Sequence, residues 1–145
     1  IDVILKVFPN AKIIWTKRQA LASIVSILQN NLVNLSWAHD LNDIFEYFKA
    51  TFDIIEYWKA IYPNQIYTLN YEQFVSNPIE ESQALYKFCE LEWNEDCLKK
   101  YKHKASNTAS SVQIRKQIHT GATKAFESYL PEFEKYNEEY PWLKS

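Results

Sequence analysis

Cations gather in two stretches of this sequence that contain no acidic residue. The stretches cover residues 3–39 and residues 97–126. Their lysines and arginines are Lys6, Lys12, Lys17, Arg18, Lys99, Lys100, Lys102, Lys104, Arg115, Lys116 and Lys124. Lys17 and Arg18 stand where a predicted strand ends and a predicted helix begins, so free backbone N–H groups and the helix dipole add to their charge. This arrangement favours the binding of a small polyanion, and two solvated surfaces that arose by chance are the alternative.

Other site chemistries do not fit the composition. The 145 residues contain one glycine, Gly121, whereas a dinucleotide fingerprint or a Walker loop needs two or three. The two cysteines and three histidines do not have the spacing of a zinc site, so no metal ligand is assigned. The 16 Lys and Arg residues stand against 18 Asp and Glu residues, and this net charge of -2 offers no uniform basic face to DNA or RNA. The sequence therefore predicts neither a metal nor a nucleic acid as a partner.

Length and hydropathy indicate one folded unit. A chain of 145 residues buries roughly two thirds of its unfolded surface, which is enough for a core without disulfides. No stretch approaches the roughly 20 consecutive apolar residues that span a bilayer, and no signal peptide opens the chain, which favours the cytoplasm. The absence of Met and the apolar run over residues 1–7 indicate that the natural beginning of the protein is missing.

The periodicity of apolar residues predicts strands that alternate with helices. The strands combine β-branched and aromatic residues between turn signals, and the helices repeat apolar residues every three or four positions. The predicted strands cover 11–18 and 65–71, and the predicted helices cover 19–33, 43–62, 79–90, 94–102 and 121–130, with an irregular loop over 103–120. The pattern predicts a helix-rich α/β fold whose few parallel strands belong to a larger sheet.

Four segments resemble, in the same order, the sulfotransferases that use 3′-phosphoadenylyl sulfate (PAPS). The resemblance is to the bacterial tetratricopeptide-linked group and the protein-tyrosine sulfotransferases, and it runs from about Leu5 to Pro131. The segments are Phe8-Pro9-Asn10-Ala11-Lys12-Ile13-Ile14 with Arg18 and Ser26, the stretch from Trp37 to Trp58, Tyr71-Glu72-Gln73-Phe74-Val75-Ser76-Asn77-Pro78, and Thr108-Ala109-Ser110-Ser111-Val112-Gln113-Ile114-Arg115. We interpret the second of them as a packing helix.

The resemblance implies five contacts to the nucleotide. In the family, the arginine and serine at the positions of Arg18 and Ser26 bind the 3′-phosphate. The tyrosine at the position of Tyr71 contacts the nucleotide near its adenine and ribose, and the fourth segment adds Ser110. Lys124 would replace a cation that the family carries one position later.

The resemblance also implies an activity and a fold. The family transfers a sulfuryl group from PAPS to an acceptor hydroxyl and releases adenosine 3′,5′-bisphosphate, within a three-layer fold like that of P-loop NTPases. Its 5′-phosphosulfate loop and its catalytic Glu or His precede the first segment. We therefore expect residues 1–131 to be the C-terminal portion of such a domain, inactive alone, followed by an aromatic, acidic tail over 132–145. No catalytic residue is assigned, because His39 and His103 qualify as bases by residue type only.

A noncatalytic interpretation stays open beside the enzymatic one. The chain would then be a nucleotide-binding or protein-interaction module, and the aromatic side chains near its end would dock on a partner. These side chains are Tyr129, Phe133, Tyr136, Tyr140 and Trp142. The acceptor hydroxyl of the enzymatic interpretation is unknown. In both interpretations exposed strand edges predict self-association into a dimer or higher oligomer.

Overall fold

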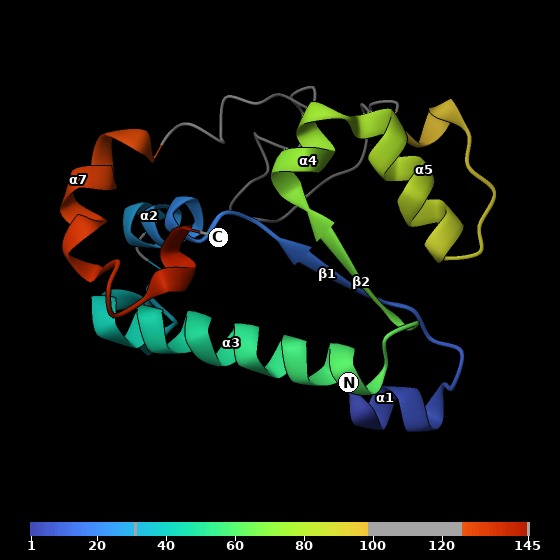
Figure 1. Cartoon of the computed structure of the whole chain (residues 1–145), viewed down its shortest axis with the longest axis horizontal. Coiled ribbons are helices and arrows are strands. Elements are labelled where there is room, and N and C mark those ends of the chain that lie inside the picture. Colours follow the sequence, from blue (N-terminus) through green and yellow to red (C-terminus); the bar gives the residue numbers. More distant parts are fainter. Residues whose placement is uncertain (31, 99–125, 145) are drawn as a thin grey trace.

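A small parallel sheet lies between helices in the computed structural model, which describes residues 1–30, 32–98 and 126–144 (Figure 1). In chain order the elements are α1 (Asp2–Val7), β1 (Ile13–Lys17), α2 (Ala20–Asn30), the 3-10 turn η1 (Ser36–His39), α3 (Leu41–Ile61), β2 (Ile66–Asn70), α4 (Tyr71–Ser76), α5 (Pro78–Phe88), and the short turns η2 (Glu95–Leu98), η4 (Glu127–Tyr129), α7 (Leu130–Phe133), η5 (Glu134–Tyr136) and η6 (Pro141–Lys144). Both predicted strands and the three longest predicted helices are present.

The differences from the prediction are local. Helices α1 and α4 were not predicted. The helix predicted over 94–102 is a 3-10 turn that the structure describes from Glu95 to Leu98, and the described end of the helix predicted over 121–130 is also a 3-10 turn. The loop predicted over 103–120 lies outside the described residues. Helix α4 had a visible signal, because Asn70 followed three residues later by Gln73 is a helix-start pattern.

The two strands run parallel, and helices cover both faces of the pair. The register pairs Ile13 with Ile66 and continues residue by residue to the end of each strand. On one face, Trp15 of β1 packs against Phe52 of α3, with ring centres 5.9 Å apart. On the opposite face, Tyr67 of β2 packs against Phe88 of α5 at 5.1 Å. Since successive side chains of a strand point to opposite faces, the layers are helix, sheet, helix, as Figure 1 shows. The predicted helix-rich α/β fold with few parallel strands is confirmed.

The largest cluster of buried side chains joins α2, the start of α3 and the end of the chain. Phe45 of α3 is fully buried, and its ring lies within 4.7 to 6.4 Å of four other aromatic rings. Those rings belong to Phe133, Tyr136, Tyr140 and Trp142. Figure 1 shows the corresponding segment, in red, beside α2 and α3. Four of the five side chains that the noncatalytic interpretation had docking on a partner thus pack in or against the core of their own chain, where they provide apolar area that α2 and α3 must bury, whereas Tyr129 is 40% exposed.

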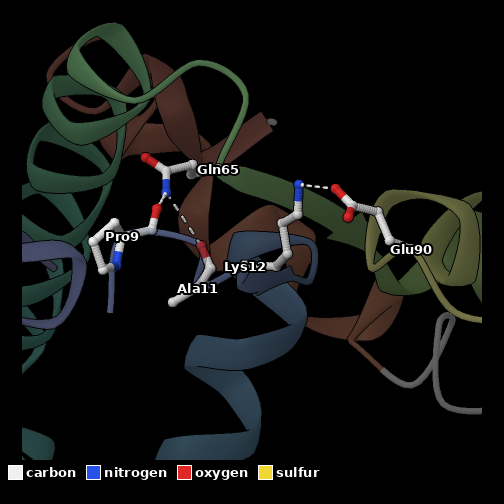
Figure 2. Close-up of polar contacts among 5 residues, drawn as sticks. All are labelled: Pro9, Ala11, Lys12, Gln65 and Glu90. Atoms are coloured by element: carbon white, nitrogen blue, oxygen red, sulfur yellow. Dashed lines mark hydrogen bonds and ion pairs between the residues drawn. The ribbon is translucent and has the colours of Figure 1, made fainter. Parts of the chain in front are cut away.

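At the amino ends of the strands, polar contacts tie neighbouring segments together (Figure 2). The side-chain amide of Gln65, just before β2, donates to the backbone carbonyl oxygens of Pro9 and Ala11, just before β1. Beside them, the ammonium of Lys12 forms an ion pair of 2.9 Å with the carboxylate of Glu90. These contacts hold the two strand entrances side by side.

Among the described residues, no helix combines the length and the apolar composition of a membrane-spanning helix.

Candidate functional site

The carboxyl ends of the two strands bring together two residues that the sequence had singled out. The register ends with Lys17 opposite Asn70, so the next residues, Arg18 and Tyr71, emerge side by side although 53 positions separate them in the chain. The central carbon of the Arg18 guanidinium lies 5.4 Å from the centre of the Tyr71 ring. A cation at this distance from an aromatic ring is attracted by its electron-rich face. The sheet therefore presents a guanidinium held over a ring at the edge where open α/β sheets bind their ligands.

The turn that follows Arg18 is held by an acidic side chain from the other strand. The backbone N–H of Gln19 donates to Oε1 of Glu72 over 3.1 Å, and both groups are partly buried. Glu72 lies in the first turn of α4, which Asn70 caps by accepting a hydrogen bond of 3.0 Å from the N–H of Gln73. The first two residues after β1, Arg18 and Gln19, thus contact Tyr71 and Glu72, the first two residues after β2. The contact between Glu72 and Gln19 was not predicted from the sequence, because a contact over 53 positions depends on the strand register.

The protein surface is hollowed on both sides of this turn. A pocket of about 180 Å³ lies at the strand ends and is lined by Lys17, Gln19, Asn70 and Glu72. A second pocket of about 220 Å³ lies between β1 and α3 and is largely apolar. Its lining residues are Trp15, Thr16, Lys17, Arg18, Ser23, Tyr47, Phe48, Thr51 and Phe52. Arg18 lines the second pocket, so open space of largely apolar character lies beside this residue.

The cations of the first acid-free stretch do not form one surface. Lys6 forms an ion pair of 2.7 Å with Asp2 on α1. Lys12 is paired with Glu90 at the amino ends of the strands, the opposite end from Arg18. Lys17 and Arg18 lie at the carboxyl ends, and the Lys17 ammonium is 5.8 Å from the centre of the Phe52 ring. Sequence spacing could not separate Lys12 from Lys17, because their partners, Glu90 and Phe52, come from distant parts of the chain.

The structure describes only some of the other predicted site residues. Ser26 is half-buried on α2, and its hydroxyl accepts a hydrogen bond of 3.3 Å from the side-chain amide of Asn30. Ser110 and Lys124 lie outside the described residues, as does His103. His39 is exposed at the end of η1. Of the five predicted nucleotide contacts, the structure brings Arg18 and Tyr71 together, and the roles of all five stay predictions.

Residues 1–30, 32–98 and 126–144 contain no group of three or more acidic, cysteine or histidine side chains that could hold a metal ion. The two cysteines are free and half-buried.

The fold and this edge define an α/β protein with a cationic, ring-supported turn at the carboxyl ends of parallel strands, an arrangement suited to an anionic ligand. Comparison with known proteins identifies the family. The model of the sulfotransferase family matches residues 1–95, and the chain belongs to this family. The match covers the first three of the four segments on which the predicted resemblance rests, and the fourth lies beyond it.

A curated relative is similar to most of the chain. It is an uncharacterized protein of Aquifex aeolicus (strain VF5), 36% identical over 134 residues. The aligned region covers 89% of this chain but 18% of the relative, so the chain spans less than a fifth of that protein's length.

Proposed function

We propose that this chain provides the 3′-phosphate and adenosine side of a PAPS-binding site in a sulfotransferase. Arg18 and Ser26 bind the 3′-phosphate, and Tyr71 contacts the adenosine. Ser110 and Lys124 complete the nucleotide contacts. The co-substrate is PAPS, the product adenosine 3′,5′-bisphosphate leaves from the same site, and the acceptor is a hydroxyl group of unknown class.

One observation carries the proposal: Arg18 and Tyr71 meet at the carboxyl ends of two parallel strands, with the guanidinium 5.4 Å from the ring centre. A guanidinium offers a planar fork of N–H donors, which matches the oxygens of a phosphate. Because the ring and the adjoining turn already restrict the Arg18 side chain, less conformational entropy is lost when the ligand binds. Membership of the sulfotransferase family makes PAPS the expected phosphate-bearing ligand.

The residues of this chain act on the nucleotide rather than on the acceptor. PAPS supplies the activated sulfuryl group: the acceptor oxygen forms a bond to sulfur while the bond from sulfur to the 5′-phosphate oxygen breaks. Arg18 anchors the nucleotide through its 3′-phosphate and so orients it, and orientation of this kind is a large part of catalysis in group transfer. No residue is assigned as the base that takes the acceptor's proton.

The test is calorimetric titration of adenosine 3′,5′-bisphosphate into the chain and into an Arg18→Ala variant. We expect selective binding by the unmodified chain and an affinity lower by about 10- to 100-fold in the variant, which is the usual effect of losing a charged hydrogen-bond donor. 5′-AMP, which lacks the 3′-phosphate, should bind weakly and equally to both proteins. Raising the salt concentration should weaken the binding of the bisphosphate more than that of 5′-AMP.

The matched control is Lys49→Ala, which removes an exposed cation on α3 that pairs with Asp53. Its affinity for adenosine 3′,5′-bisphosphate should equal that of the unmodified chain. Equal affinity for the bisphosphate and 5′-AMP in a folded sample, or an Arg18→Ala variant as selective as the unmodified chain, would contradict the proposed function.

A further inference from the structure

The geometry points to Glu72 as the positioning residue for the phosphate-binding arginine. This inference rests on the proposed function and deepens it. The carboxylate of Glu72 holds the Arg18–Gln19 turn against the start of α4, so that the guanidinium stands ready over the Tyr71 ring before the nucleotide arrives. Glu72 itself does not touch the 3′-phosphate.

Glu72 reaches the turn after β1 from the segment that follows β2. Its Oε1 accepts the N–H of Gln19 over 3.1 Å, in a partly buried position. The N–H belongs to the residue directly after Arg18, so the bond fixes the backbone from which the guanidinium extends. A hydrogen bond to an ionised acceptor contributes more than one between neutral groups.

The segment that carries Glu72 is itself held in place. The side chain of Asn70 accepts the N–H of Gln73, and the strand register holds Asn70 beside Lys17. Tyr71 lies between the capping residue, Asn70, and Glu72. Residues 70–73 therefore place the Tyr71 ring against the Arg18 guanidinium and the Glu72 carboxylate against the backbone N–H of Gln19.

The Glu72 carboxylate lies at the beginning of α2. The carbonyl oxygen of Gln19 accepts the N–H of Ser23, so Gln19 is the N-cap, the residue directly before α2. Accepting the N–H of that residue is the task of the glutamate in a capping box, which Glu72 performs here from another part of the chain. Its negative charge stabilises the start of the helix. Because Glu72 Oε1 already accepts the N–H of Gln19, the phosphate is left to the Arg18 side chain.

The experiment separates the reach of the side chain from its charge. Glu72→Asp keeps the charge but is one methylene too short for Gln19, whereas Glu72→Gln keeps the reach and an acceptor oxygen but loses the charge. The probes are adenosine 3′,5′-bisphosphate and adenosine 2′,5′-bisphosphate, which carry the same groups and differ in where one phosphate is attached. Glu80→Asp, on the exposed first turn of α5, is the control variant.

We expect Glu72→Asp to bind the 3′,5′-isomer about tenfold more weakly, the size of one lost hydrogen bond to a charged group, and the 2′,5′-isomer as before. Glu72→Gln should stay within about threefold of the unmodified chain for both isomers, since its amide oxygen still accepts the N–H. The Gln19 amide should exchange with solvent faster in Glu72→Asp and at the unmodified rate in Glu72→Gln and Glu80→Asp. That readout needs no nucleotide.

Two results would overturn the role of Glu72 alone: a Glu72→Asp variant as selective for the 3′,5′-isomer as the unmodified chain, or a Glu72→Gln variant that loses selectivity as much as Glu72→Asp does. If the unmodified chain does not distinguish the isomers, the proposed function fails and the role of Glu72 fails with it. The two failures are therefore told apart by the unmodified chain.

Discussion

A single carboxylate, Asp2, joins the first helix to the end of the longest one. Its Oδ1 accepts a hydrogen bond of 3.0 Å from the hydroxyl of Tyr62, directly after α3, and its Oδ2 lies 2.7 Å from the ammonium of Lys6. The hydrogen bond from Lys6 and then that from Tyr62 lower the pKa of Asp2 below its ordinary value of 3.8. Both partners favour the ionised carboxylate, so the contact depends on pH.

We predict that this contact stabilises the fold above the unfolded pKa of Asp2 and is lost as the pH falls through the lower, folded pKa. The chain should therefore lose more stability than an Asp2→Asn variant between about pH 5 and about pH 2. Urea unfolding at a series of pH values measures both curves. Parallel curves for the two proteins in this range would show that Asp2 does not gain its partners on folding.

At the scale of elements, the capping residues decide where helices begin. Helix α3 starts after Asp40, whose Oδ1 accepts the N–H groups of Asn42 at 2.8 Å and Asp43 at 3.2 Å. The fourth and fifth residues of α3, Ile44 and Phe45, are both fully buried. A helix start that is held in place thus positions two of the largest buried side chains.

Replacing Asp40 by Ala should lower the free energy of unfolding by about 1 kcal/mol, the usual effect of losing a helix cap. Asp40→Asn should restore most of the loss, because Asn caps helices about as well as Asp. Asn42→Ala is the control, since it keeps the backbone N–H that Asp40 accepts. Chemical denaturation measures all three variants, and an Asp40→Ala variant as stable as the control would rule out the cap as a stabilising contact.

At the scale of the whole molecule, the end of the chain completes the core begun by α2 and α3. Leu143 is fully buried and belongs to the cluster that contains Phe45 and Ile24. Turn η6, which carries Leu143, packs against α2. The noncatalytic interpretation had five aromatic side chains near this end docking on another protein, and four of them pack in or against the core, whereas Tyr129 stays exposed. Self-association through the strand edges stays a prediction.

Leu143→Ala should lower the free energy of unfolding by about 2 to 5 kcal/mol, because it removes buried apolar atoms and leaves a cavity. Leu91→Ala, at a leucine that is 61% exposed, should change it by less than about 0.5 kcal/mol. Thermal or urea unfolding compares the two variants. Equal stabilities would mean that the end of the chain does not contribute to the cooperative core.

The sequence by itself determined the two strands and the three longest helices, because their signals are local: the apolar repeat of α3, the β-branched residues of β1 and the proline that opens α5 each act within a few residues. It also indicated Arg18 and Tyr71 as site residues, since each stands in a short motif of its own. That the two residues meet was decided by the tertiary structure, through the parallel register of the strands.

The parallel register also decided contacts and positions that no local sequence pattern indicates. It brought Glu72 to the backbone of Gln19, and it left Lys12 at the opposite end of the sheet from Arg18. The core position of Leu143 likewise depends on α2 and α3, which lie more than 80 positions earlier in the chain. The physical reason is that side-chain patterns report which face of an element will be buried, whereas the partner on that face is selected only when the whole chain packs.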